Sequence, residues 1–168
     1  MFVLGIDPGL TRCGYCVLKA DRHRSTAVAM GVLRTDRESP VADRLAELWV
    51  DLCQLLDEFD LSAVAVERVL FQTNVRTAIG VAQAAGVVMA ESARRGLDVV
   101  EYSPNQVKDA VAGYGSADKA QVQEMVQVLL GLDTPPRPPD AADAAAIALT
   151  YLAFNAGSAA LLGKASRA

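Results

Sequence analysis

The fold is indicated most clearly by one run near the start of the chain, Phe2-Val-Leu-Gly-Ile-Asp-Pro-Gly-Leu-Thr-Arg-Cys-Gly14. Its first six residues, Phe2–Asp7, form an apolar run that predicts a strand, and this strand leads into Asp-Pro-Gly, a strong turn signal. Gly14–Lys19 (GYCVLK) is expected to be a second strand and Ala27–Thr35 (AVAMGVLRT) a third. Three short strands with tight connections indicate an antiparallel meander.

After these strands the apolar residues change period, from strand alternation to helical spacing. Val41, Leu45, Leu48, Leu52, Leu55 and Leu56 recur at three- and four-residue steps, which is typical of an amphipathic helix. The remaining expected elements are a buried strand over Ala63–Glu67, a long helix over Asn74–Arg95, a strand over Asp98–Tyr102, a helix over Asn105–Ala112 capped by Ser103 and Pro104, a helix from about Ser116 to Leu130, and an Ala-rich helix over Asp140–Phe154.

This order predicts an α/β protein with a mixed five-stranded sheet, three antiparallel strands followed by parallel strands, flanked by helices. With 168 residues the chain is long enough for one core. We expect a single domain over residues 1–156 and a disordered tail over 157–168, which is small and polar.

Composition excludes a membrane span, since no uninterrupted apolar run approaches the roughly 20 residues that a bilayer requires. No targeting peptide is visible, so a cytoplasmic location is expected. The formal net charge of −4 argues mildly against a nucleic-acid partner. That objection weakens if four carboxylates converge on metal, because two divalent cations would neutralise them.

Two acids end predicted strands and two more begin a predicted helix. Asp7 and Glu67 stand at the carboxyl ends of their strands, where ligands gather in open α/β sheets. Asp140 and Asp143 are three residues apart in the first turn of the last helix, so they share one face. Separately, Asp7 could be a turn residue and the other two could be helix caps. Together the four predict a metal cluster.

A cluster of like charges is unfavourable unless cations occupy it. Ligands that are all oxygen select hard ions, Mg²⁺ or Mn²⁺ rather than Zn²⁺. Two such ions about 3.5–4 Å apart would support in-line displacement at a phosphodiester.

Four motifs together resemble a known family. They are Gly5-Ile-Asp-Pro-Gly-Leu-Thr-Arg-Cys-Gly14, Ala65-Val-Glu-Arg-Val69, Gly113-Tyr-Gly-Ser-Ala-Asp-Lys-Ala-Gln-Val122 and Asp140-Ala-Ala-Asp-Ala-Ala-Ala-Ile-Ala148. In this order and spacing, over roughly residues 1–155, the chain resembles the crossover junction endodeoxyribonuclease family RuvC.

The resemblance implies a ribonuclease-H-like fold and a Mg²⁺-dependent nuclease, with two ions per active site and Mn²⁺ as a substitute. It implies a homodimer that binds a four-way (Holliday) junction in recombination and repair. Two strands of like polarity would be nicked symmetrically, leaving 5′-phosphate and 3′-hydroxyl ends. RuvA and RuvB, the branch-migration proteins, are the implied partners. The metal-binding acids would be Asp7, Glu67, Asp140 and Asp143.

The resemblance also implies contacts with DNA. Lys108 and Lys119 match basic positions near the junction backbone, and Lys119 could steady the charge of the transition state. The loop Leu70–Arg76 offers Phe71 for stacking on an unpaired base, although some members carry the aromatic residue one position earlier, where this chain has Leu70. Arg68, Asn74 and Arg76 are further candidate contacts. The alternative for each basic residue is an ordinary solvated surface side chain.

Small residues are frequent in the helix Asn74–Arg95, and small side chains allow close approach of a second helix. Because two symmetric scissile sites require a two-fold protein, we expect this helix to contribute to the dimer interface. Cys13 and Cys16 fall three apart on a strand, so they should point to opposite faces and not grip one ion. His23, the only histidine, is expected to be exposed and inert.

Three alternatives remain at this point. A ribonuclease-H-like nuclease could act on RNA instead of junction DNA. Asp-Pro-Gly-Leu-Thr after a strand also occurs in phosphate-binding hairpins of sugar kinases and actin-like ATPases, but those proteins duplicate the domain, and 168 residues leave no room for that. A binding-only protein that has lost catalysis finds no support, since all four acids are present.

Overall fold

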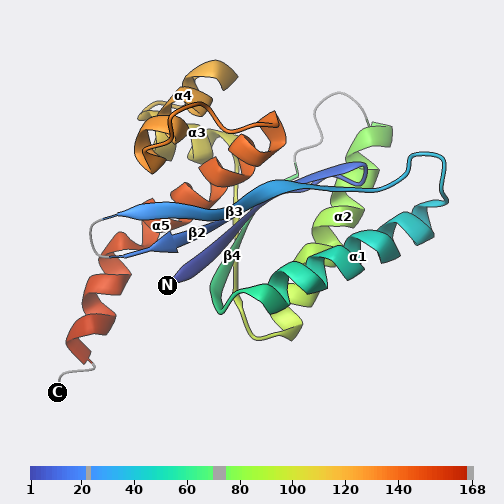
Figure 1. Cartoon of the computed structure of the whole chain (residues 1–168), viewed down its shortest axis with the longest axis horizontal. Coiled ribbons are helices and arrows are strands. Elements are labelled where there is room, and N and C mark those ends of the chain that lie inside the picture. The colour runs from blue at the N-terminus through green and yellow to red at the C-terminus, as the bar shows by residue number, and fades with distance from the viewer. Residues whose placement is uncertain (22–23, 70–74, 166–168) are drawn as a thin grey trace.

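The computed structural model describes residues 1–21, 24–69 and 75–165, with side chains omitted at 75–77 and 156–165. Figure 1 shows the arrangement of the elements. In chain order they are β1 (Phe2–Asp7), β2 (Arg12–Ala20), β3 (Ser25–Arg34), α1 (Val41–Glu58), β4 (Leu61–Glu67), α2 (Val75–Arg94), β5 (Asp98–Tyr102), α3 (Pro104–Ala112), α4 (Lys119–Leu130) and α5 (Pro139–Ala165).

The five strands form one mixed sheet in the order β3-β2-β1-β4-β5. β2 pairs antiparallel with both β1 and β3, which is the predicted meander. β4 pairs parallel with both β1 and β5. The carboxyl ends of β1, β4 and β5 therefore lie at the same edge of the sheet, and the predicted fold class is confirmed.

Helices cover both faces of the sheet: α1 and α2 pack on one, and α3, α4 and α5 on the other (Figure 1). Each face has its own core, with Leu4, Ile6 and Leu52 in the first and Val3, Leu18 and Ile147 in the second. This separation follows from the strand period of two, which sends neighbouring side chains to opposite faces.

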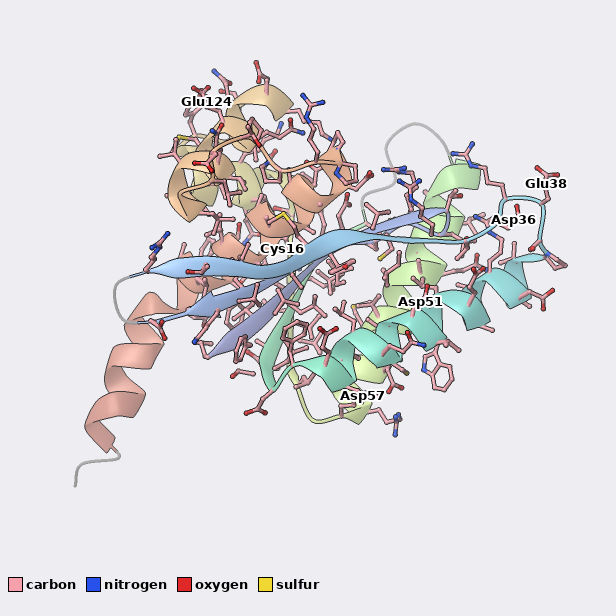
Figure 2. The ribbon with its side chains drawn as sticks, in the orientation of Figure 1. Cys16, Asp36, Glu38, Asp51, Asp57 and Glu124 are labelled. Carbon is pink, nitrogen blue, oxygen red and sulfur yellow. The ribbon has the colours of Figure 1, made fainter. Side chains whose placement is uncertain are left out.

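The cysteines of β2 follow the same rule. Cys13 is buried beneath α1 and α2, whereas Cys16, labelled in Figure 2, is buried on the α5 face. Burial raises the pKa of each thiol to about 12, which keeps both protonated. The prediction that the two side chains point to opposite faces of the sheet is confirmed.

Helix α5 packs against the sheet at glycines. A Cβ atom on Gly5 of β1 would overlap the backbone oxygen of Ala144, and one on Gly14 of β2 would overlap that of Asp140. Glycine inside a strand marks such a close approach of another backbone. The alanines of α5 fill the contact without forcing it apart, since Ala141, Ala144 and the neighbouring small residues are buried. The start of α5 is thereby held beside β1 and β2.

Several predicted element bounds are corrected by the structure. Ser103 caps α3 and Pro104 is its first residue, as expected, but α4 begins at Lys119 with Asp118 as its cap, not at Ser116. Asp118 is preferred because Gln121 completes a capping box with it. The last helix extends to Ala165, so its predicted end at Phe154 is wrong. Helix ends fray, and the disorder expected for 157–168 stays a prediction.

The negative charge of the chain is spread over more than one region. Acidic side chains such as Asp51 and Asp57 lie along α1, as Figure 2 shows, on the far side of the sheet from α3 and α4. Part of the net negative charge therefore lies on α1, away from the edge of the sheet where β1 and β4 end, so the net charge of the chain does not give the charge at that edge. No helix in residues 1–21, 24–69 and 75–165 is long and apolar enough to cross a membrane.

Candidate active site

The four acids predicted from the sequence lie at one edge of the sheet. Asp7 ends β1 and Glu67 ends β4, and the parallel pairing of Ile6 with Val66 puts these two ends side by side. Gly14, which pairs with Asp7 across to β2, contacts the backbone of Asp140. Asp143 follows one turn later on α5.

Electrostatics confirms that the carboxylates are close enough to influence one another. Burial first, and then the charges of Glu67, Asp143 and Asp140 in that order, raise the pKa of Asp7 to about 8, although the charge of Lys119 acts in the opposite direction. Burial also raises the pKa of Glu67, with Asp143 adding to the effect. A carboxyl group that holds its proton near neutral pH is typical of a buried acid with other acids close to it.

Two cations of the chain already pair with this cluster. Lys119 Nζ donates to Asp143 Oδ2 at 2.6 Å, and Arg12 donates to Asp140 Oδ2 through Nε at 3.0 Å and through a terminal nitrogen. Burial alone would raise the pKa of Asp140, but the hydrogen bonds and charge of Arg12 outweigh it and lower that pKa. For Lys119 the effects are opposite in sign. Burial alone would lower the pKa of its ammonium group, but the hydrogen bond to Asp143 outweighs burial and the pKa is raised.

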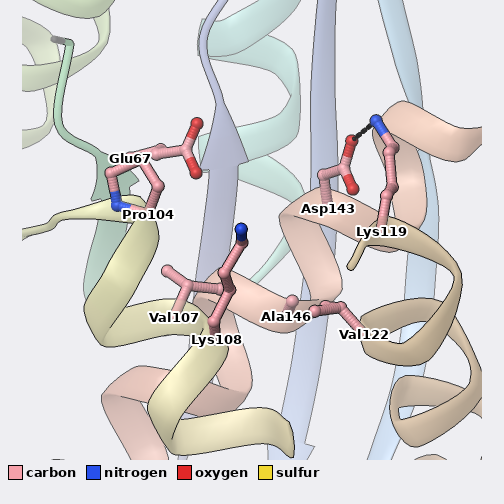
Figure 3. Close-up of a pocket in the computed structure, with 8 residues that line it drawn as sticks. All are labelled: Glu67, Pro104, Val107, Lys108, Lys119, Val122, Asp143 and Ala146. Atoms are coloured by element: carbon pink, nitrogen blue, oxygen red, sulfur yellow. Dashed lines mark hydrogen bonds and ion pairs between the residues drawn. The ribbon is translucent and has the colours of Figure 1, made fainter. Parts of the chain in front are cut away.

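A cavity of about 230 Å³ opens between β4, α3, α4 and α5. Figure 3 shows Glu67 on one side, Asp143 with its partner Lys119 on the other, and the Lys108 ammonium pointing into the space between them. Apolar side chains of Val107, Val122 and Ala146 form its floor. Two acids and two lysines around a small cleft can bind a phosphate and the cations that accompany it.

The structure brings six of the predicted site residues to this edge: the four acids, Lys108 and Lys119. Arg68, directly after Glu67, has an exposed side chain, and its backbone N–H bonds Tyr102 O at 2.8 Å. Leu70, Phe71 and Asn74 lie outside the described residues, as does His23, and the side chain of Arg76 is not described. Their expected roles stay predictions.

Sequence reasoning missed Arg12 and the residues that fix the turn before it. Arg44 of α1 donates to Thr35 Oγ1 at 3.0 Å and to Thr11 Oγ1 at 2.6 Å. Thr35, which is buried, donates in turn to Leu10 O at 2.5 Å. This network ties the β1–β2 turn to α1 and to the end of β3. Arg12 belongs to the first motif, Gly5–Gly14, but nothing near it in sequence indicates a partner on α5.

The donor set fits a hard divalent cation, since four carboxylates offer only oxygen ligands. The raised pKa of Asp7 is caused first by burial and then by the negative charge of the neighbouring acids, and a bound cation would offset that charge. Within the described part of the chain, no three acidic, histidine or cysteine side chains converge closely enough to enclose an ion as they stand. Asp140 and Asp143 are turned to Arg12 and Lys119 instead.

A mixed sheet in this strand order, with acids at the carboxyl ends of β1 and β4 and at the start of the last helix, defines the ribonuclease-H-like class of proteins. Comparison with solved structures confirms the class. Thermus thermophilus RuvC superposes with a TM-score of 0.87 at 35% identity, covering 94% of this chain and 97% of that one.

Within that class, the profile described as "Crossover junction endodeoxyribonuclease RuvC" matches residues 3–151, and the chain belongs to this family. The crossover junction endodeoxyribonuclease RuvC of Leifsonia xyli subsp. xyli is 52% identical over 160 residues, covering 95% of this chain and 76% of that protein. The T. thermophilus RuvC solved in complex with a Holliday junction substrate has a TM-score of 0.86 and 37% identity, covering 92% and 94% of the two chains.

Proposed function

We propose that this protein is an endonuclease that resolves four-way DNA junctions by metal-dependent hydrolysis of two symmetric phosphodiester bonds, in homologous recombination and DNA repair. The observation that carries the proposal is the placement of four acids at one edge of the sheet, Asp7 and Glu67 at neighbouring strand ends and Asp140 and Asp143 at the start of α5, in a chain of the RuvC family. The related T. thermophilus protein, solved with a Holliday junction, supports the substrate. Family membership favours this function over an RNA nuclease or a sugar-kinase-like domain.

Mg²⁺ is the proposed cofactor, two ions per site, with Mn²⁺ able to replace it. Asp7, Glu67, Asp140 and Asp143 would hold the ions. When bound, Mg²⁺ supplies Lewis-acid stabilisation of phosphate charge and promotes ionisation of the attacking water.

The two lysines of the cavity, Lys108 and Lys119, are proposed to bind the phosphodiester and to stabilise its negative charge. The Lys119 side chain is 63% exposed, so its ammonium can turn from Asp143 to a phosphate and stabilise the charge that develops there. Lys108, opposite Glu67 in the cavity, binds and orients the phosphodiester. Cleavage on the 3′-oxygen side leaves a 5′-phosphate and a 3′-hydroxyl. Arg68, Phe71, Asn74 and Arg76 are proposed to contact the junction arms and the crossover.

Symmetric nicks require a two-fold dimer, and α2 is proposed as part of its interface. Ile79, Gln83, Gly86 and Ala90 are exposed at helical spacing along α2. Among the described residues, and apart from the chain neighbours of Gly86 and the adjacent backbone of α2, no atom lies within 4 Å of a Cβ at Gly86. Trp49 of α1, 44% exposed, donates to Glu91 beside this face.

RuvA and RuvB are the proposed partner proteins. The reaction would take place in the cytoplasm, where bacterial DNA lies.

The test is cleavage of a mobile four-way DNA junction, with products read on a denaturing gel. Linear duplex, RNA–DNA hybrid and single-stranded RNA are compared at the same concentrations. We expect paired symmetric nicks in the junction with Mg²⁺ and none with EDTA. Asp7→Asn should abolish them, whereas Asp60→Asn, an exposed acid in the turn before β4, should not. Preferential cleavage of RNA or hybrid would overturn the proposal.

A further inference from the structure

Arg12 holds an acid that the proposed function assigns to metal. Two of its N–H groups, from Nε and a terminal nitrogen, converge on a single atom, Asp140 Oδ2. The pair is partly shielded, with side chains 32% and 27% exposed. Charge-assisted bonds of this kind are stronger than neutral ones, and shielding from water limits their screening.

The position of Arg12 is set by the fold. It is the first residue of β2, and the backbone of Asp140 packs on Gly14, two residues further along the same strand. The turn before Arg12 is tied to α1 by Arg44 through Thr11. Both ends of the ion pair therefore stand on rigid elements, and the contact is built into the junction of β2 with α5.

Lys119 makes a looser contact on the neighbouring acid. Its single bond to Asp143 comes from a side chain that is 63% exposed, about twice the exposure of Arg12. Lys119 can leave Asp143 by rotating into solvent at small cost. Arg12 cannot leave Asp140 without giving up two bonds to one oxygen.

We propose that Arg12 is a built-in counter-cation that competes with the divalent ion for Asp140, so that it lowers the metal affinity of the protein in the absence of DNA. This inference rests on the proposed function, which makes Asp140 a metal ligand. A dication ligated by Asp140 would lie within a few ångströms of the guanidinium, and like charges at such separations repel. Metal binding at Asp140 is therefore opposed while Arg12 stays on Oδ2, and a bound ion favours the turn of Arg12 away from Asp140.

DNA would relieve this competition. A phosphate at the rim of the cluster offers the guanidinium a new anionic partner, and Arg forms bidentate bonds to phosphate readily. Metal and DNA would then bind with positive coupling, each raising the affinity for the other. The divalent ion would load fully only when substrate is present.

The experiment is calorimetric titration of the 168-residue chain with MnCl₂ without DNA, so the readout does not depend on cleavage. Arg12→Gln removes the cation and keeps a polar side chain, and we expect Mn²⁺ to bind about three- to tenfold more tightly, the range of a partly exposed ion pair. Arg12→Lys keeps the charge and should stay within about twofold of wild type. Thermal unfolding in EDTA checks that each variant folds cooperatively.

Unchanged or weaker Mn²⁺ binding by Arg12→Gln would overturn the inference, as would equal gains in Arg12→Gln and Arg12→Lys, since charge would then not be the cause. Asp140→Asn separates this failure from failure of the proposed function. If Mn²⁺ binds neither to wild type nor to Arg12→Gln, or if its binding persists undiminished in Asp140→Asn, the metal site itself is wrong and the inference falls with it.

Discussion

Asp7→Asn should make the metal-free protein more stable while it removes activity. The pKa of Asp7 is raised from 3.8 to about 8, first by burial and then by Glu67, Asp143 and Asp140. Because the folded state holds this proton more tightly than the unfolded chain, the contribution of Asp7 to stability is fully present below about pH 4. It is lost as pH rises towards 8. Each pKa unit corresponds to about 1.4 kcal/mol.

At pH 7 the pH is about three units above the pKa of Asp7 in the unfolded chain, 3.8. The free energy of unfolding is therefore lower than at pH 4 by up to about 4 kcal/mol on account of this carboxyl group. Asparagine keeps the size of the side chain and has no proton to lose. We therefore expect Asp7→Asn to unfold at a temperature roughly 10 °C above wild type at pH 7 in EDTA, given about 2–4 °C per kcal/mol for a chain of this size. The gain should shrink to nothing at pH 4.

The assay is thermal and urea unfolding across pH 4–8, with EDTA or with Mg²⁺. Saturating Mg²⁺ should raise the stability of wild type and not that of Asp7→Asn, since the ion binds only the folded site. Asp60→Asn, at an exposed turn, serves as the matched control and should change stability by less than about 0.5 kcal/mol. If Asp7→Asn is no more stable than wild type at pH 7 in EDTA, the buried Asp7 carboxyl does not destabilise the metal-free fold.

Other substitutions test the packing, the chemistry and the assembly. Gly5→Ala should destabilise the protein by about 2 kcal/mol or more in urea unfolding, because its Cβ would overlap the backbone of α5; a change under 0.5 kcal/mol would mean that α5 does not press on β1 there. Lys119→Met should lower kcat on junction DNA by about 10²-fold with KM little changed, and equal loss from Lys119→Arg would argue against a charge role. Gly86→Arg should convert a dimer to a monomer by light scattering, and a wild-type monomer at micromolar concentration would contradict the dimer directly.

Much of the architecture could be predicted because its signals are local. The turn after Asp7, the helical period of the leucines in α1 and the capping residue Ser103 are each set by neighbours in sequence. The start of α4 could also have been predicted better. Gln121 lies three residues after Asp118, which is capping-box spacing, and this signal favours Asp118 over Ser116.

The acidic cluster could be predicted from topology, but its internal pairing could not. Parallel strands end at one edge, so Asp7 and Glu67 were expected to meet. The bond from Arg12 to Asp140 spans 128 positions and depends on where α5 packs. The backbone of Asp140 can approach β2 because Gly14 has no side chain there. No periodic pattern contains that information. The length of α5 was missed for a different reason, because its small and polar last residues resemble a tail.

Anomalous diffraction from crystals soaked in Mn²⁺ would show whether the four acids hold divalent cations. We expect one or two manganese peaks among Asp7, Glu67, Asp140 and Asp143, about 2.0–2.3 Å from carboxylate oxygens, with Arg12 turned away from Asp140. Peaks absent from this edge of the sheet at millimolar Mn²⁺, or found only at acids such as Asp51 and Asp57 on α1, would contradict this expectation.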